Sequence, residues 1–350
     1  MTTNGTNEPI ERKVQLTGGS TYTISLPKEW ATDNGVETGT PLDIYAADDR
    51  IVAARKSGAE GRTVEIDAGD CTPDALGDTV LTAYVAGYDE IVLTSPIEFD
   101  AERRRAVRAA VTRLVGVEIQ SQTPTRIEIR SLLDGAEVSL RQTVVQMRLT
   151  ALTMHEDAVR AVVEGDADLA RRVIDQDDDV DRLFGLVSRQ FHRGLADFRA
   201  AVAFDVDRLD AFAYYRIARQ LERIADHAEK IAGVAERRSE APPADLGDEL
   251  TDLGERAREI VRTALDEQLD DPSLSGLQDA DARRDAVLDD ASGIDRRLYD
   301  GDVEEAHLLA TVLDSVRRTA EYGANVAEMG LQSALRTTDT EGADEDALSS

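Results

Sequence analysis

Apolar residues recur at every third or fourth position through most of the second half of the chain, beginning near residue 132. This spacing places them on one face of a helix and is typical of helices that pack against other helices. The clearest example is the seam Ile217, Leu221, Ile224, Ala228, Ile231 and Ala235. Six long helices are predicted here, over residues 135–163, 169–199, 207–238, 246–269, 276–298 and 303–335.

The six predicted helices form two sets of three, separated by the linker sequence Ser-Glu-Ala-Pro-Pro. Leu221 aligns with Val316 at an offset of 95 positions, and the neighbouring small and apolar residues follow the same offset. A repeat of this length predicts two copies of one three-helix unit, residues 132–240 and 241–335. Residues 336–350 are small, polar and acidic, which predicts a disordered acidic tail.

Residues 1–58 show the alternating pattern of short β-strands rather than a helical one. The predicted strands are 12–16, 21–25, 42–46 and 51–55. A short helix begins after Pro27, where proline suits the first turn. So few apolar positions make a thin core, which predicts that this unit is stabilised as a homodimer.

Residues 59–131 alternate between strand and helix, in the order strand, helix, strand, helix, strand, strand. The strands are predicted at 63–66, 90–94, 117–122 and 126–130, and the helices at 72–86 and 101–115. This order indicates a small open α/β layer, so the whole chain is predicted to be an α+β multidomain protein. Gly87 and Gly116 are isolated, so neither strand is followed by the glycine-rich loop of a nucleotide site.

The composition is strongly acidic: 40 basic and 70 acidic residues give the 350-residue chain a formal net charge of -30. A surface this acidic, with few lysines, predicts a protein adapted to high salt, where screening weakens the self-repulsion. Cys71 is the single cysteine, which excludes a disulfide framework. No stretch approaches 18 apolar residues and the N-terminus is polar, so we expect a cytoplasmic protein without direct membrane insertion.

Four carboxylates stand out on two of the predicted helices. Asp177 occupies a position where its helix otherwise presents apolar residues, and Asp181 follows one turn later. Glu222 and Asp226 lie four residues apart, one position off the apolar seam. If the two helices pack antiparallel, the four side chains converge and suit a metal ion held by oxygen ligands. The alternatives are a solvated acidic flank and aspartates that only complement the helix dipole.

The second repeat carries a modified version of this pattern. Asp281 and Asp285 keep the four-residue spacing, and Glu321 stands where Asp226 stands in the first repeat. Arg317, however, takes the place of Glu222. Because a guanidinium repels a metal cation, we expect a degraded second copy in which Arg317 forms a salt bridge with Asp281 or Asp285.

The stretch Leu-Glu-Arg-Ile-Ala-Asp-His-Ala-Glu-Lys-Ile-Ala, residues 221–232, resembles the signature helix of PhoU-type phosphate-signalling proteins. The resemblance covers about residues 133–335. It implies two repeated three-helix bundles whose acidic pairs bind transition-metal ions, iron or zinc. It also implies negative control of phosphate uptake or signalling, with a phosphate transporter or its sensor kinase as partner.

Residues 25–30, Ser-Leu-Pro-Lys-Glu-Trp, and the turn Val-Glu-Thr-Gly-Thr-Pro-Leu resemble the swapped-hairpin domain of the AbrB/SpoVT/MazE type. That family intertwines two chains and binds DNA through basic residues, which correspond here to Arg12, Lys13 and Lys28. Residues 1–58 hold six basic and eight acidic residues, a net of -2 against -28 for the rest of the chain. This contrast favours contact with promoter DNA. A dimerisation module without DNA binding is the alternative.

Two functions remain open from the sequence. One is a DNA-binding phosphate-homeostasis regulator, and the other is an accessory protein that docks on a phosphate transporter or its kinase without DNA. An enzyme is not predicted. A di-metal oxidase of the helical-bundle type uses two Glu-x-x-His pairs, and only Glu304 with His307 fits that pattern.

Overall fold

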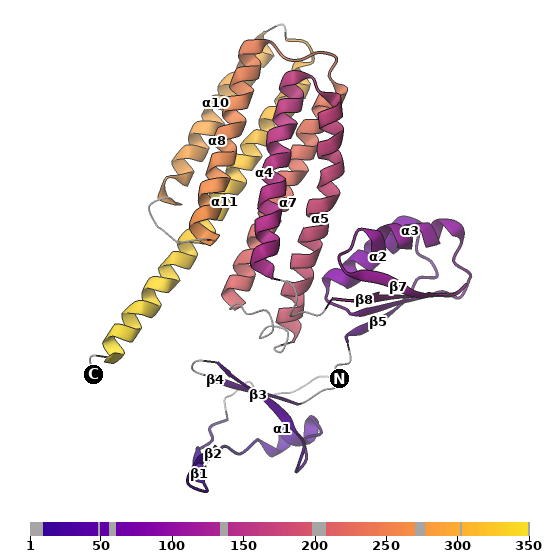
Figure 1. The fold of residues 1–350 in the computed structure, drawn as a ribbon, viewed down its shortest axis with the longest axis vertical. Helices are drawn as coiled ribbons and strands as arrows, with labels where there is room; N and C mark the ends of the chain where they lie inside the picture. The colour runs from indigo at the N-terminus through magenta and orange to yellow at the C-terminus, as the bar shows by residue number, and fades with distance from the viewer. Residues whose placement is uncertain are drawn as a thin grey trace. The chain divides into compact units, whose positions relative to one another are not determined.

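The computed structural model describes residues 10–47, 50–55, 61–133, 139–197, 208–269, 277–301 and 303–348 (Figure 1). The chain divides into two compact units, Met1–Glu60 and Gly61–Ser350. The second unit contains both an α/β layer and a helical domain, which contact each other. The predicted helix start at 135 and the second-repeat helix start at 276 lie outside the described residues.

The N-terminal unit consists of two separate hairpins and one short helix. Its elements are β1 (Gln15–Thr17), β2 (Thr21–Thr23), α1 (Lys28–Asp33), β3 (Leu42–Ala47) and β4 (Arg50–Arg55). β1 pairs with β2 and β3 with β4, both antiparallel. Gly18 and Gly19 form the first turn with φ of 66° and 82°, a backbone region that glycine reaches without strain.

No side chain described within this N-terminal unit is buried. Leu16, Tyr22, Ile44 and Ile51 are 59%, 75%, 67% and 72% exposed. A two-stranded hairpin is marginally stable by itself, and apolar side chains on it need a surface to pack against. The unit therefore has the small strand content that the sequence predicts, and it lacks a core of its own among the described residues.

The α/β layer has the order of elements that the sequence predicts. It runs β5 (Thr63–Asp67), α2 (Pro73–Val85), β6 (Glu90–Thr94), α3 (Ala101–Thr112), β7 (Val117–Gln122) and β8 (Arg126–Ser131). The sheet order is β5-β6-β8-β7, in which β5 is parallel to β6 and the other neighbours are antiparallel. The side chains of Thr72 and Asp100 accept hydrogen bonds from backbone N–H groups at the starts of α2 and α3.

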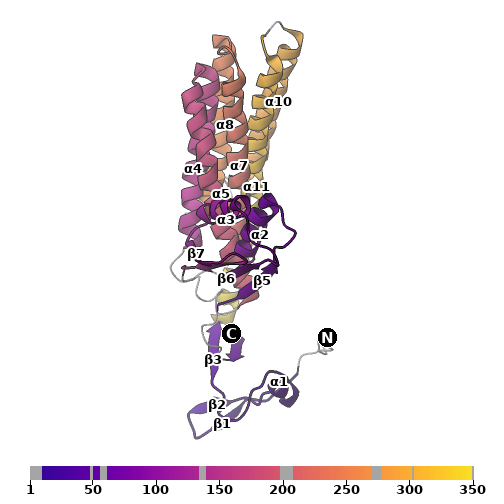
Figure 2. The ribbon, with the colours of Figure 1, turned by 90° about the vertical axis from the view of Figure 1, so that its right-hand side faces the viewer.

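Both helices of this layer lie on one face of the sheet (Figures 1 and 2). Leu76, Val80 and Val107 from the helices meet Leu93 and Ile127 from the central strands, and each of the five is fully buried. The layer therefore has its own hydrophobic core, as alternating strands and helices require.

Six helices make up the rest of the described chain. They are α4 (Leu140–Glu164), α5 (Ala167–Ala196), α7 (Arg208–Arg237), α8 (Ala244–Leu269), α10 (Ala280–Asp300) and α11 (Ala306–Leu348). Both sets of three predicted helices are present. Among the described residues, none of these helices has the length and the hydropathy that a membrane span requires.

The end of α11 differs from the prediction. A disordered tail was expected over residues 336–350, but the helix continues to Leu348. Extending an existing helix needs no new nucleus, so a polar segment without proline can continue one that begins in the core. The low hydrophobicity of these residues excluded a packed core and did not exclude a helix.

The two three-helix sets share a single hydrophobic core rather than forming two separate bundles. α11 packs on both α7 and α8, and α4 packs on α8 as well as on its own repeat. Gly323 of α11 allows a close approach, because a Cβ atom there would lie 2.9–3.0 Å from Ile260 and Val261 of α8. The repeats are therefore fused along α4, α7, α8 and α11.

The α/β layer is anchored to α5 by a buried arginine. Arg189 donates hydrogen bonds to the carbonyl oxygens of Tyr84 at 2.9 Å and Tyr88 at 2.6 Å, and to Asp89 at 2.7 Å. Its side chain is 1% exposed, and Arg193 donates to the same Asp89 carboxylate at 2.9 Å. Because every one of these contacts compensates the buried charge, the layer is fixed at this end of α5.

Candidate metal centre

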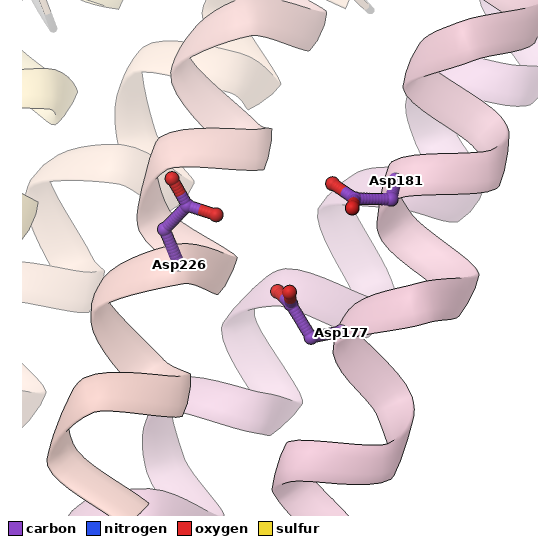
Figure 3. Close-up of side chains that lie close together, drawn as sticks. All are labelled: Asp177, Asp181 and Asp226. Carbon is purple, nitrogen blue, oxygen red and sulfur yellow. The ribbon is translucent and has the colours of Figure 1, made fainter. Parts of the chain in front are cut away.

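Three carboxylates from two helices meet between α5 and α7. Asp177 and Asp181 project from α5 and Asp226 from α7, and Figure 3 shows all three pointing toward one another. One oxygen atom from each lies within 4.8 Å of the others. The packing of α5 against α7 thus brings together three of the four carboxylates that the sequence predicts to converge in the first repeat.

The position of Asp177 follows from the sequence of α5. Val173 and Val180 on either side of it are fully buried, so residue 177 faces the neighbouring helix. Asp226 lies at the edge of the buried face of α7, since Ile224 and Ala225 directly before it are fully buried. Asp181 lies one turn further along α5 and is exposed. The cluster therefore lies at the edge of the core, open to solvent on one side.

Glu222 lies beside the cluster without joining the group of three. One of its oxygens accepts a hydrogen bond from Arg219 at 2.9 Å, and its side chain is 13% exposed. The other oxygen, Oε2, is buried without a hydrogen-bond partner among the described residues, as is Oδ1 of Asp177. Buried acceptor oxygens normally receive a hydrogen bond, so two unpaired ones beside one cluster are suited to coordinate a cation.

The electrostatics of the cluster lead to the same conclusion. Burial, followed by repulsion from Asp181 and the other carboxylates nearby, raises the pKa of Asp177 to about 7. Burial and the charge of Asp226 raise the pKa of Glu222 to about 7. The pKa of Asp181 is raised too, first by partial desolvation of its carboxylate beside the neighbouring helix and then by the charge of Asp226. A metal cation would replace the protons that these carboxyl groups otherwise hold near neutral pH.

The donor set is entirely oxygen. Carboxylate ligands suit hard and intermediate cations such as manganese and iron, and zinc also accepts them. His227, which follows Asp226 on α7, is engaged elsewhere: Nδ1 lies 3.1 Å from Oγ of Ser315 and Nε2 lies 3.4 Å from the hydroxyl of Tyr322. This histidine therefore connects α7 to α11.

The second repeat does not bring its acidic residues together in the described part of the chain. Asp281 and Asp285, 76% and 66% exposed, both pair with Arg284 of their own helix. Glu321 pairs with Arg318 at 2.8 Å.

The salt bridge expected for Arg317 is also different, because its partner is Asp295 at 3.8 Å rather than Asp281 or Asp285. Asp281 and Asp285 fall on the exposed face of α10, whose buried positions are Ala280, Val287, Ala291, Ile294 and Leu298. The four-residue spacing was therefore preserved without the inward placement that Asp177 has.

The predicted DNA-contacting residues are all in the N-terminal unit and all exposed. Arg12 and Lys13 precede β1, and Lys28 is the first residue of α1. A guanidinium nitrogen of Arg12 donates to the carbonyl oxygen of Glu11 at 2.9 Å.

A groove beside the cluster was not expected from the sequence. It has a volume of about 690 Å³ and lies between α2 and α3 of the layer and α5 and α7 of the helical domain. Asp181 and Glu222 line it, together with Arg113 and Asp178, which form an ion pair. No sequence pattern relates residues 113 and 178, since their contact depends on how the layer docks on α5.

Two family models match the chain. The PhoU domain model matches residues 144–235, and the model described as antidote-toxin recognition MazE, bacterial antitoxin, matches residues 15–60.

Two curated relatives carry the name phosphate-specific transport system accessory protein PhoU homolog. The one from Synechocystis sp. is 26% identical over 210 residues, which is 57% of this chain and 89% of the relative. The one from Clostridium acetobutylicum is 24% identical over 137 residues, which is 39% of this chain and 62% of the relative. The match thus spans less than two thirds of the second relative.

Two solved structures are similar. PhoU from Pseudomonas aeruginosa has a TM-score of 0.44 and 21% identity, over 55% of this chain and 93% of that one. The phosphate transport system regulatory protein PhoU from Streptococcus pneumoniae has a TM-score of 0.43 and 19% identity, over 55% of this chain and 91% of that one.

The sequence matches and the fold coincide at the carboxylate cluster. Asp177, Asp181 and Asp226 all fall within the segment that the PhoU model matches, on two helices of the first repeat. The hairpins of the N-terminal unit fall within the other match. The chain is therefore similar to PhoU domains over residues 144–235 and to MazE-type antitoxin domains over residues 15–60.

Proposed function

We propose that this protein is a cytoplasmic regulator of phosphate transport whose PhoU domain binds a metal ion. The observation that carries the proposal is the position of the carboxylate cluster within the matched domain. The names of both curated relatives, which are accessory proteins of phosphate-specific transport, support the process. The role fits negative control of uptake and needs no enzymatic step.

Asp177, Asp181 and Asp226 would hold the ion, with Glu222 within reach as a further ligand. Iron and zinc are the candidates from the resemblance, and the all-oxygen donor set adds manganese. A bound cation supplies positive charge at the point where α5 and α7 present like charges to each other. Metal status would then change the free energy of packing between these two helices, which makes the cluster suitable for sensing.

The N-terminal unit would form the dimer and contact DNA. The exposed apolar residues of its hairpins support an intertwined pair, in which the second copy supplies the missing core. The exposure of Arg12, Lys13 and Lys28 supports contact with promoter phosphates. In this reading the protein regulates transcription of phosphate-transport genes.

A second function has its own support. The relatives are named for the transport system rather than for DNA binding. The chain also carries a net charge of -30, which opposes contact with a polyanion. The protein would then dock on a transporter component or a sensor kinase, and the N-terminal unit would serve dimerisation alone.

Promoter binding separates the two functions. Wild type, Arg12→Ala/Lys13→Ala and Asp177→Asn/Asp226→Asn would be titrated in high salt onto a promoter fragment of phosphate-transport genes, with and without phosphate. A coding-region fragment of equal length is the control. Regulation of transcription predicts promoter-specific binding by the wild type, a uniform loss in the first variant and a changed phosphate response in the second. Equal, sequence-independent binding by all three proteins favours docking.

A further inference from the structure

Among the described residues, the α/β layer and the helical domain form ion pairs at two places of different character. The Arg189–Asp89 contact is buried and supported by Arg193. The other contact pairs Arg113, the residue that caps the end of α3, with Asp178 of α5. The side chains of this second pair are 59% and 53% exposed, so it can open without leaving a buried charge behind.

The exposed pair stands next to the carboxylate cluster. Asp178 follows Asp177 directly on α5, and Arg113 and Asp178 line the same groove as Asp181 and Glu222. The groove therefore brings the Arg113–Asp178 pair onto the same surface as Asp181 of the cluster.

The charge of Arg113 acts on the cluster as well as on Asp178. Arg113 lines one groove with Asp181 and Glu222, so its guanidinium shares a solvent-facing surface with their carboxylates. On the α7 side, Arg219 of that same helix donates a hydrogen bond to Glu222 at 2.9 Å. Glu222 thus has a counter-ion on its own helix, whereas Asp178 of α5 receives positive charge from the α/β layer.

We propose that Arg113 is an internal counter-ion of the carboxylate cluster, displaced when Asp177, Asp181 and Asp226 bind a metal ion. The inference rests on the metal site proposed above. Two cations close to the same carboxylates repel each other, so each weakens the binding of the other. The metal ion therefore loosens the Arg113–Asp178 contact, and Arg113 lowers the affinity of the cluster for the metal ion. Arg113 is a positioning residue in this scheme, because it acts through Asp178 and Asp181 and does not touch the metal.

Metal affinity is the first test. Mn²⁺ is titrated into the metal-free full chain by calorimetry, for the wild type, Arg113→Gln, Arg113→Lys and Arg108→Gln. Arg113→Gln should bind Mn²⁺ about two- to fivefold more tightly, the size expected for loss of one exposed ion pair. Arg113→Lys keeps the charge and should match the wild type. Arg108 is exposed on the same helix, so Arg108→Gln removes an equal charge away from the cluster and should also match it.

Hydrogen exchange of the backbone amides is the second test. If Arg113 had only a structural role, exchange near it would not depend on the metal ion. Mn²⁺ should speed exchange at residues 110–115, at the end of α3, in the wild type. In Arg113→Gln the same amides should already exchange faster and respond little to Mn²⁺. Residues 80–84 of α2, next to the buried Arg189 contact, should not respond in either protein.

The outcomes separate the inference from the function beneath it. Equal Mn²⁺ affinities for the wild type, Arg113→Gln and Arg108→Gln overturn the role of Arg113 and leave the metal site intact. Tighter binding by Arg108→Gln as well reduces the effect to overall charge and also overturns it. If the wild type binds no Mn²⁺, Zn²⁺ or Fe²⁺, the metal site fails and the proposed coupling fails with it.

Discussion

At the scale of single residues, Asp177 shows how one polar residue on an apolar seam identifies a site. The flanking Val173 and Val180 place it against α7, where burial and other carboxylates oppose its ionisation. A carboxyl group whose pKa is raised in the folded protein favours folding while it is protonated. This contribution is full below about pH 4, the unfolded pKa, and is lost as the pH rises through about 7.

Asp177→Asn should therefore change the pH dependence of stability in the metal-free protein. Asparagine cannot ionise, so the variant should be more stable than the wild type by about 1–2 kcal/mol at pH 8, after allowance for solvent screening, and equal to it near pH 4. Urea unfolding at both pH values measures this. Asp175→Asn on the exposed face of α5 is the control. An equal gain in the control at pH 8 would contradict the assignment to the cluster.

Some residues of the site could be found from the sequence and others could not. Asp177, Asp181 and Asp226 were predictable because their positions relative to apolar neighbours fix the helix face on which they lie. Arg189 and Arg113 carry no such signal, because their partners Asp89 and Asp178 are supplied by long-range docking. Local spacing alone also suggested a second site in the other repeat, whose carboxylates pair with arginines instead.

At the scale of elements, the long helices and the α/β layer were predictable because each follows one period over many residues. The ends of the helices were less predictable: α11 continues to Leu348, beyond its predicted end at residue 335. The fusion of the two repeats along α8 and α11 depends on the glycine at 323, which periodicity alone does not reveal as a contact position.

Gly323→Ala tests that contact. The new Cβ atom would lie 2.9–3.0 Å from Ile260 and Val261 of α8, so the helices must separate, and we expect a loss of about 1–3 kcal/mol in unfolding free energy. Gly293→Ala on α10 is the matched control, because a Cβ atom there meets nothing within 4 Å. It should be neutral or stabilising by up to about 1 kcal/mol. Thermal unfolding of both variants decides, and a stabilised Gly323→Ala would contradict the close packing.

At the scale of the whole molecule, the exposed apolar hairpins predict a dimer through the N-terminal unit. Ile44 and Ile51 are 67% and 72% exposed within one chain. Ile44→Glu/Ile51→Glu should change the unfolding free energy of a monomer little, because both side chains are exposed there. It should convert a dimer to monomer, because the charges would be buried at the interface. Light scattering after size exclusion measures the mass.

Leu149→Glu is the control for this experiment, since Leu149 is equally exposed at 63% but lies on α4. It should leave the mass unchanged. A dimer that persists in Ile44→Glu/Ile51→Glu and dissociates in Leu149→Glu would place the interface in the helical domain.

A metal ion held between α5 and α7, within the segment that the PhoU model matches, is the basis of the proposed function. The direct measurement is the metal content of the full chain, purified without chelators and determined by elemental analysis, for the wild type, Asp177→Asn/Asp226→Asn and Asp281→Asn/Asp285→Asn. We predict about one ion or more per wild-type chain, loss of it in the first variant and full retention in the second, whose carboxylates pair with Arg284. A wild type without bound iron, zinc or manganese, or equal metal content in all three proteins, would contradict a metal centre at this cluster.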